Sequence, residues 1–495
     1  MTIPTAARAR RVNLYLFALL LLSYGYYFDP GQNWNSNSRL ALVWSIVDDG
    51  TVRIDKYQAT TRDIAYRDGH YYSDKAPGLS LLGVPVYWTL KHTIGPGLTS
   101  DQLQRVATQQ INFWWNTMPT VILALLLMHF LALLGFSLTV RLWTTLAYAL
   151  GSLVYPYATI VFGHQLAAVL GFVPFLIAYL VKRGQMRWPM AALFGAGLLA
   201  GWGVVVEYTN ALIVLALVAY VSLALGGSMG DRVRRIAAFG MGVLPAAAAL
   251  LTYNGLAFGH PFSIGYGLEA ESAFAGGMGQ GLFGVTWPPS IKVAAALLFG
   301  GYRGLFVYSP FLLLAAPAAV ALWRRSAMRP EVLVSAFVVT GFLLFNASYY
   351  MWWGGAAIGP RFLVPTLPFL AWPVAEAIRR WRTLAMSLVG ASLLLGYTMA
   401  ATRPDGVEEH YAFPLVDTVL VRLIHGDTLS YMMVFLPRFW PHVHFALSLL
   451  PLAAGVLLLG GLLLRAAYGV APTAAGARAA AATPAAAPAT TGAAG

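Results

Sequence analysis

The sequence contains no cysteine, which excludes disulfide bonds, thiolate metal ligands and a cysteine nucleophile. Charged residues are scarce as well: they form 10% of the chain, whereas a soluble protein carries roughly a quarter. Hydrophobic residues form 58% of the 495 residues, so we expect a polytopic membrane protein rather than a soluble domain. The formal net charge of +13 does not indicate a nucleic-acid partner, because the basic residues occur in short clusters between apolar runs.

Apolar runs recur along the whole chain, and a helix needs about 20 apolar residues to span the hydrocarbon core. The first run follows three arginines and ends without a small-residue cleavage site, which favours an uncleaved signal anchor. The run Leu79–Gly95 contains Pro85 and is predicted to be either a span or a re-entrant helix. The other predicted spans are residues 12–28, 112–134, 141–158, 161–181, 189–205, 209–226, 236–256, 305–323, 332–350, 361–377, 383–400 and 443–464.

Clusters of Lys and Arg predict the orientation, because cytoplasmic loops carry an excess of basic residues. If the N-terminus is inside and Leu79–Gly95 does not cross fully, one side of the membrane receives 18 basic residues and three acidic ones. A full crossing of that run would invert the later loops, unless Gln102–Leu134 is broken into two passes. The opposite, extracytoplasmic side then carries the long segments, which makes it the predicted functional face. These segments are residues 29–78, 257–304, 351–360 and 401–442.

The predicted fold class is all-α: a polytopic helical bundle of 12 to 13 transmembrane helices, whose first outer loop, residues 29–78, bears short interfacial helices. Residues 1–400 form the main transmembrane module, and residues 401–468 add an outer segment and the last transmembrane helix. Residues 469–495 consist almost entirely of Ala, Thr, Pro and Gly. We expect this tail to be disordered, because it has too little apolar bulk to build a core.

The first outer loop is the most acidic part of the chain, with seven aspartates and no glutamate. An aspartate there can act as a general base that takes a proton from an acceptor hydroxyl. Asp48-Asp49-Gly50 and Arg67-Asp68-Gly69 are typical of turns, so their aspartates are discounted. The candidates for the base are Asp63, which we favour, Asp55 and Asp29.

The loop closes on Ser73-Asp74-Lys75-Ala76-Pro77-Gly78, where a helix is predicted to begin because proline is favoured in a first helical turn. A helix N-terminus beside the ammonium of Lys75 is suited to a lipid phosphate. Tyr72, just before this segment, is a further candidate for a substrate contact, and Asp74 is the candidate metal ligand. The alternative is that Asp74 only caps the helix and Lys75 only extends to the membrane surface.

Two further candidates lie near the predicted outer ends of spans. Glu207 stands between two apolar runs, and an ionisable residue at membrane depth is a functional candidate because its burial is costly. His164 falls on the same side and could contact a phosphate. The alternatives are an interfacial carboxylate already in water for Glu207 and a structural histidine for His164.

Arg303 and Arg361 each lie where an outer segment meets an apolar run. A guanidinium at such a place matches the oxygens of a phosphate in a bidentate manner, so both are candidate phosphate ligands. Trp352 belongs to the aromatic segment 349–355 and is a candidate substrate contact, with an interfacial aromatic belt as the alternative.

Together these segments resemble the GT-C superfamily of integral membrane glycosyltransferases, especially the branch of the protein O-mannosyltransferases and the lipid A aminoarabinose transferase. In that family, a long acidic first outer loop ends in an acidic-Lys-Pro-Pro-type segment, whose place Asp74-Lys75-Ala76-Pro77 takes here. Gly50–Asp55 looks like the usual Gly-Asp turn of that loop. Gly359–Pro365 resembles the Arg-Tyr-Leu-x-Pro pattern of a late helix.

The likeness runs from about residue 12 to 400 and departs from the family at one place. Ser36-Asn37-Ser38-Arg39-Leu40 stands where the family has an Asp-Glu-x-Arg-Tyr element shortly after the first span. The catalytic aspartate of the family therefore cannot be transferred by motif, and the three candidate bases stay open.

The resemblance implies a transferase that moves a sugar from a polyprenyl-phosphate donor to an acceptor hydroxyl on a glycan, lipid or protein. The reaction would take place at the outer face of the cytoplasmic membrane, with inversion, an aspartate as base and a divalent cation as the candidate cofactor. Two alternatives stay open. One is a lipid-linked glycan polymerase or ligase that uses a diphosphate carrier; the other is a transporter or flippase, which would carry ionisable residues at the membrane midplane.

Overall fold

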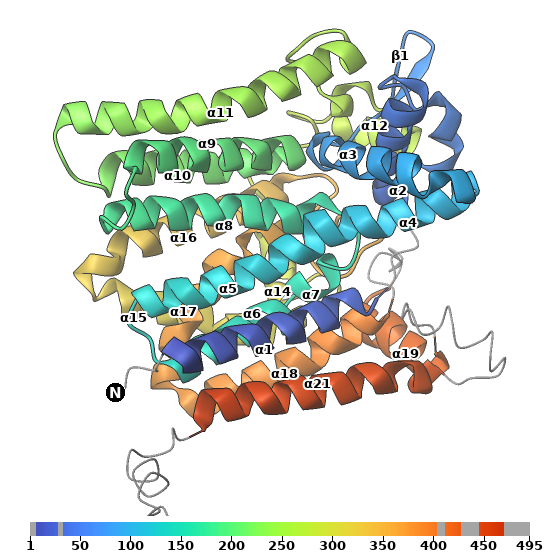
Figure 1. Cartoon of the computed structure of the whole chain (residues 1–495). Helices are drawn as coiled ribbons and strands as arrows, with labels where there is room; N and C mark the ends of the chain where they lie inside the picture. The colour runs from blue at the N-terminus through green and yellow to red at the C-terminus, as the bar shows by residue number, and fades with distance from the viewer. Residues whose placement is uncertain (1–5, 28–32, 403–410, 427–444, 470–495) are drawn as a thin grey trace, which may run out of the picture.

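The computed structural model describes residues 6–27, 33–402, 411–426 and 445–469 of the chain (Figure 1). This part contains 20 α-helices, and the long helices lie side by side in one bundle. Seven helical segments of the described residues are long and apolar enough to cross a membrane, so the chain is a multi-pass membrane protein by helix length and composition. They are Ser100–Leu133, Gly163–Lys182, Pro189–Val206, Met229–Phe258, Ser326–Ser348, Arg382–Ala401 and Leu447–Tyr468.

The helices of the first half carry the first loop and the N-terminal part of the bundle. They are α1 (Ala6–Gly25), α2 (Trp34–Trp44), α3 (Gly78–Thr93), α4 (Ser100–Asn112), α5 (Met118–Leu133), α6 (Leu138–Leu150), α7 (Val154–Tyr157), α8 (Gly163–Lys182), α9 (Pro189–Val206) and α10 (Ala211–Leu223).

The second half begins with the longest helix. Its helices are α11 (Met229–Phe258), α12 (Ser272–Met278), α13 (Ile291–Phe299), α14 (Leu305–Tyr308), α15 (Ala315–Trp323), α16 (Arg329–Ser348), α17 (Leu367–Arg380), α18 (Arg382–Ala401), α19 (Val421–His425) and α21 (Phe445–Tyr468). The last of these packs along α1, so the two ends of the described chain lie together (Figure 1).

Helix ends follow local sequence signals. The backbone N–H of Gln102 donates to Thr99 Oγ1 and the N–H of Thr99 donates to Gln102 Oε1, which forms a capping box at the start of α4. Ser228 and Asp231 form the same motif at the start of α11. That helix ends at Gly259, whose φ of 79° is readily adopted only by glycine.

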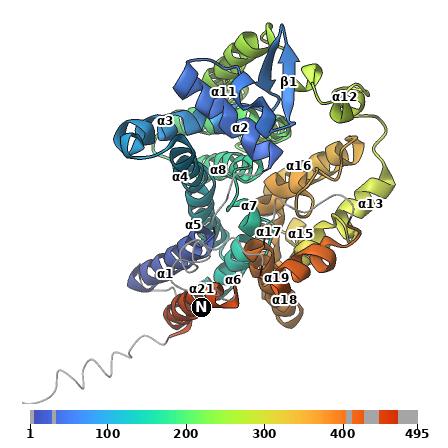
Figure 2. The same cartoon turned by 90° about the vertical axis from the view of Figure 1, so that its right-hand side faces the viewer.

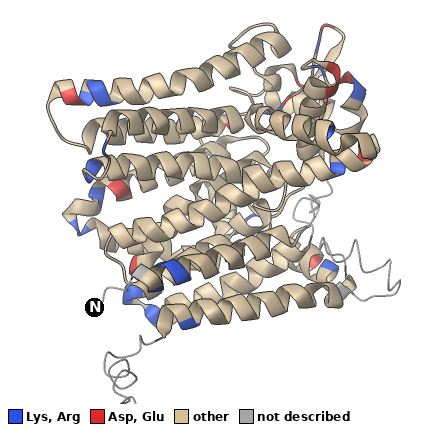
Figure 3. Cartoon of the chain, in the orientation of Figure 1, with Lys and Arg blue, Asp and Glu red and all other residues tan. Residues whose placement is uncertain are grey.

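The apolar run Leu79–Gly95 forms α3, which is not among the candidate spans of the described residues. It packs against α2, α4 and the end of α9, at the end of the bundle that carries the first loop (Figure 1). The prediction that all basic clusters lie on one side of the membrane required that Leu79–Gly95 does not cross it fully. The position of α3 agrees with that requirement. Figure 3 shows the same separation, because Lys and Arg gather at the opposite ends of the long helices from the acidic first loop.

The first loop contains a β-hairpin, so the all-α prediction is incomplete. Strand β1 (Ile64–Arg67) pairs antiparallel with β2 (His70–Ser73), and Ile64 lies opposite Ser73. Asp68 and Gly69 form the turn with φ of 51° and 86°, and Asp-Gly is the pair that such tight hairpin turns favour. The predicted turn at Arg67–Gly69 is confirmed. Short helical pieces also occur in this loop, at α2, residues 45–49 and residues 55–60.

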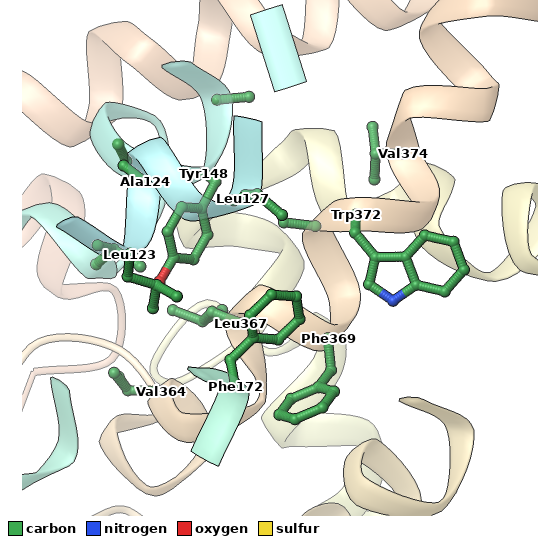
Figure 4. Packing of buried hydrophobic residues seen from close by; sticks show 14 of the residues in the cluster. Leu123, Ala124, Leu127, Tyr148, Phe172, Val364, Leu367, Phe369, Trp372 and Val374 are labelled. Carbon is green, nitrogen blue, oxygen red and sulfur yellow. The ribbon is translucent and has the colours of Figure 1, made fainter. Parts of the chain in front are cut away.

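The main core lies between the long helices and is rich in aromatic side chains (Figure 4). Phe172 of α8 and Phe369 of α17 pack with ring centroids 5.1 Å apart, and Trp372 is fully buried. A separate cluster lies under the hairpin, where Tyr72 packs on Phe258 of α11 with ring centroids 6.2 Å apart. The hairpin is therefore attached to the end of α11.

Three predictions fall wholly or partly on residues outside the described ranges: the candidate base Asp29, the tail from 470 to 495, and the outer segment 401–442, of which 403–410 and 427–442 are not described.

Candidate functional site

A cavity of about 340 Å³ lies at the end of the bundle that carries the hairpin. Its wall combines α2, the hairpin ends, the start of α8, the junction between α9 and α10, the loop from α11 to α13, the end of α16 and the segment before α17. Figure 2 looks onto this end and shows β1, α2, α12 and α16 around the same region. Residues far apart in the sequence thus meet in one cavity.

The hairpin brings two aspartates together. Asp63 immediately precedes β1 and Asp74 immediately follows β2, and the pairing of Ile64 with Ser73 puts both at the open end of the hairpin. The Ser38 hydroxyl of α2 fixes this end: it donates to the carbonyl of Asp63 at 2.6 Å and lies 2.7 Å from Ser73 Oγ. The hairpin therefore brings Asp63 and Asp74 close together although they are not neighbours along the chain.

Lys75 lies between the two carboxylates. Its Nζ is 2.7 Å from Asp74 Oδ2 and 3.0 Å from Asp63 Oδ2. Burial opposes the charge of the ammonium, but the two carboxylates raise the pKa of Lys75 well above its usual value. Burial raises the pKa of Asp74 to about 6, against the lowering effect of Lys75.

Asp74 does not cap the following helix. Helix α3 begins at Gly78 with Pro77 as its N-cap residue, and no side chain caps it. The carboxylate of Asp74 points instead to Lys75 with Oδ2, while Oδ1 is buried without a hydrogen-bond partner among the described residues. The alternative in which Asp74 is only a cap is therefore wrong.

Glu207 forms a buried ion pair with Arg39 of α2. Arg39 Nη2 donates to Glu207 Oε1 at 2.7 Å, and its other donors reach Asn35 Oδ1 at 3.1 Å and the carbonyl of Ala76 at 3.0 Å. Both side chains are at most 10% exposed. Burial raises the pKa of Glu207 although Arg39 opposes this effect. The pair ties α2 and the segment before α3 to the end of α9.

His164 lies on the other side of Glu207, with Nδ1 3.6 Å from Glu207 Oε1. The preceding Gly163 makes this approach possible, because a Cβ there would lie 2.3 Å from the same carboxylate oxygen. His164 and Glu207 both line the cavity.

Arg361 lines the cavity without an anionic partner. Its guanidinium lies 5.4 Å from the ring centroid of Phe162 and 5.1 Å from that of Phe362. Its Nε is buried with no hydrogen-bond partner, and no carboxylate of the described residues forms an ion pair with it. This cation is the one in the described wall that is free to meet an anionic ligand.

Glu269 is a cavity residue that the sequence analysis missed. The N–H of Ala270 donates to the carbonyl of Ile64 at 2.9 Å, and the main chain of Glu269 pairs with that of Ala65 in an isolated antiparallel β-bridge. The loop after α11 therefore extends the edge of the hairpin. The Glu269 carboxylate accepts a hydrogen bond from the N–H of Glu271 at 3.3 Å. Burial first, and then Asp74, raise the pKa of Glu269 to about 8.

Four predicted site residues lie elsewhere in the described structure. The Asp55 carboxylate is 2.8 Å from His70 Nδ1 and accepts from the N–H of Tyr71 at 2.6 Å, away from the cavity. Tyr72 packs in the cluster under the hairpin. Trp352 packs beside Tyr302, with ring centroids 6.2 Å apart.

Arg303 is the fourth residue outside the cavity wall. Its guanidinium is buried and donates to the carbonyls of Trp353 at 2.9 Å and Gly355 at 2.8 Å and also to that of Ala357. It also lies 4.1 Å from the ring centroid of Tyr302. These donors hold the loop that leads to Arg361, so Arg303 acts on the cavity through that loop.

The missed residues had weak sequence signals. Arg39 belongs to the Ser36–Leu40 element that departs from the family pattern, and its charge in an otherwise polar segment was the available clue. Glu269 and Tyr266 lie in the outer segment 257–304, where no motif singles them out. Their place beside Asp74 depends on the main-chain pairing of this loop with β1.

The residues of this cavity do not fit a metal ion. Within the described ranges, no group of three or more His, Asp or Glu side chains is placed to hold one. The ammonium of Lys75 occupies the position between Asp63 and Asp74 that a cation would take. The prediction of Asp74 as a metal ligand therefore finds no complete set of ligands.

Comparisons with known proteins leave the family open: no family model matches the chain, and neither a curated protein nor a solved structure matches it. The fold and the site thus define a multi-pass helical membrane protein with a charged cavity at one end of its bundle.

Proposed function

We propose that this chain is an inverting GT-C-type glycosyltransferase that moves a sugar from a polyprenyl-phosphate donor to an acceptor hydroxyl. One observation carries the proposal: Asp63, Lys75 and Arg361 share a cavity whose lining includes carboxylates, a guanidinium without an ion-pair partner among the described residues, and apolar side chains. A lipid-linked phosphosugar requires all three kinds of surface.

The proposal places this cavity at the outer face of the cytoplasmic membrane, with the basic helix ends in the cytoplasm. Besides the seven long segments, the helices α1, α6, α10, α15 and α17 run in the same bundle and would bring the proposed number of crossings to twelve (Figure 1). Helices α2 and α3 and the hairpin would then lie at the outer surface.

In the proposed reaction, the acceptor oxygen attacks the anomeric carbon of the sugar while the bond from that carbon to the phosphate oxygen breaks. Asp63 takes the proton of the acceptor hydroxyl. The departing polyprenyl phosphate keeps the electron pair of the broken bond, and its charge is stabilised by Arg361 and Lys75. A single displacement inverts the configuration at the anomeric carbon.

The apolar part of the wall suits the first prenyl units. Leu212 at the start of α10 and Phe345 near the end of α16 line the cavity, together with Phe274 and Met278 of α12 and Leu282 of the loop that follows it. Such side chains favour a hydrocarbon chain over water. The acceptor is a glycan, lipid or protein hydroxyl.

The test uses membranes that contain the protein and a panel of radiolabelled polyprenyl-phosphate sugars. We expect one of these donors to lose its label to an acceptor, and we expect Asp63→Asn and Asp74→Asn each to abolish this transfer at unchanged expression. Asp55→Asn is the matched control, because Asp55 is in the same loop but outside the cavity wall. Full activity of Asp63→Asn would remove it as the base, and transfer from diphosphate-linked glycans alone would indicate a polymerase or ligase.

A further inference from the structure

The charges of the cavity wall are paired with two exceptions. Among the described residues, Glu207 is paired with Arg39, and Asp63 and Asp74 share Lys75. The exceptions are Arg361, a cation without a carboxylate, and Glu269, a carboxyl group without a cation in any ion pair. A ligand that completes this wall must offer an anion to Arg361 and a suitable partner to Glu269.

The position of Glu269 is fixed by the backbone. The bridge to Ala65 and the hydrogen bond from Ala270 N–H to the carbonyl of Ile64 hold it at the edge of β1, and Asp63 is the residue just before that strand. Gly265 of the same loop packs so closely on the main chain of Asp74 that a Cβ would lie 2.6 Å from its Cα. Glu269 is thus held beside both aspartates.

We propose that Glu269 is a catalytic residue that contacts the donor in its neutral form, by donating a hydrogen bond from its carboxyl group to the donor phosphate, whose negative charge Arg361 meets in the same cavity. This inference rests on the proposed function. It adds to that function a phosphate-binding group that the outer segment 257–304 supplies. A carboxylic acid that donates to a phosphate anion forms a charge-assisted hydrogen bond. An ionised Glu269 would offer no donor and would repel the same phosphate.

The surroundings of Glu269 keep its proton in place near neutral pH. Burial and the nearby Asp74 and Asp63 disfavour a further negative charge, Lys75 opposes them, and the balance raises the pKa of Glu269 to about 8. Tyr350, two residues after the end of α16, also faces this carboxyl group. Glu271, the next acid of the loop, is 3.9 Å from Arg62 and does not line the cavity.

The sign of the pH dependence follows from this assignment. Below a pH of about 8 Glu269 is neutral and the phosphate is bound. Above it, only the shrinking protonated fraction binds, so the apparent dissociation constant for the donor should rise up to roughly tenfold per pH unit. A general base at Glu269 would give the opposite trend, with activity rising through the same pH range.

The experiment compares the whole protein with Glu269→Gln, Glu269→Ala and Glu271→Gln in lipid nanodiscs. Binding of polyprenyl phosphate, the lipid without its sugar, is measured from well below to well above a pH of about 8. We expect the unchanged protein and Glu271→Gln to lose affinity at alkaline pH. Glu269→Gln, neutral at every pH and still a hydrogen-bond donor, should bind without this loss, and Glu269→Ala should bind roughly ten- to a hundredfold more weakly throughout.

Titration of the lipid phosphate itself would affect every variant alike, so the difference between Glu269→Gln and the unchanged protein isolates Glu269. An equal alkaline loss in both, or a folded Glu269→Gln that does not bind at any pH, would overturn the inference and leave the proposed function standing. If the unchanged protein does not bind polyprenyl phosphate at all, both fall. Thermal unfolding of each variant shows whether it is folded.

Discussion

At the scale of single residues, the ion pair of Glu207 and Arg39 sets up a stability prediction. Both side chains are buried, and Arg39 uses its remaining donors on Asn35 and Ala76. Glu207→Gln would leave the guanidinium without its carboxylate, and breaking a buried pair in this way costs about 3–5 kcal/mol. We expect a clear loss of thermal stability, measured by unfolding of the purified protein in detergent.

The matched control is the exposed pair of Asp101 and Arg105 on α4, which lie 2.8 Å apart with both side chains more than half exposed. Asp101→Asn should leave the unfolding temperature nearly unchanged, because exposed pairs contribute little. Equal effects of the two substitutions would mean that Glu207 does not hold the cavity wall together.

Much of the site was predictable residue by residue. Asp74 and Lys75 stood out because the acidic loop closes on them, and Asp63 because it lies in that loop without a turn role. Glu207 and Arg361 stood out as ionisable residues at the ends of apolar runs. The sequence could not separate Arg361 from Arg303, since both occupy similar places. The difference arises from the backbone carbonyls that take up the donors of Arg303, and only the folded loop provides these.

At the scale of elements, the hairpin is what sequence reasoning understood least. Its turn at Asp68 and Gly69 was recognised, but strands of four residues are too short for a clear alternating pattern. As a result, the sequence did not predict the strand pairing that makes Asp63 and Asp74 neighbours. Glu269 was missed for the same cause, because it joins this hairpin from a segment about 200 residues away in the chain.

The contact of α3 with α9 gives a prediction at the same scale. A Cβ at Gly78, the first residue of α3, would lie 2.6 Å from the main chain of Val205 and Val206 at the end of α9. Gly78→Ala should therefore push apart the start of α3, which follows Lys75, and the end of α9, which precedes Glu207. We expect a loss of transfer and a destabilisation of about 1–3 kcal/mol, measured by the transfer assay and by thermal unfolding.

Gly195→Ala on α9 is the control for this prediction, because no atom lies within 4 Å of the added Cβ. It should retain both activity and stability. If Gly78→Ala behaved in the same way, the close contact of the two helices would not position the site.

At the scale of the whole molecule, hydropathy predicted a multi-pass helical bundle, and seven of the twelve predicted spans coincide with helical segments long and apolar enough to cross a membrane. The long apolar helices fall where the apolar runs lie, and the interrupted run at Leu79–Gly95 forms a short helix outside the candidate spans. Composition could not reveal which helix ends surround the cavity, because that depends on packing between segments distant in sequence. The orientation in the membrane remains a prediction from the loop charges.

Cysteine labelling can test this orientation, because the chain has no cysteine of its own. Asp68 lies at the exposed turn of the hairpin, which packs on the end of α11, and Arg234 lies near the start of that helix, at the opposite end of the bundle (Figure 1). If the basic ends face the cytoplasm, a membrane-impermeant maleimide added to intact cells should label Asp68→Cys and leave Arg234→Cys unlabelled until the cells are opened. The reverse pattern would place the cavity in the cytoplasm. A donor and an acceptor at the outer face could then not reach Lys75 and Arg361, and the proposed transfer would have to be abandoned.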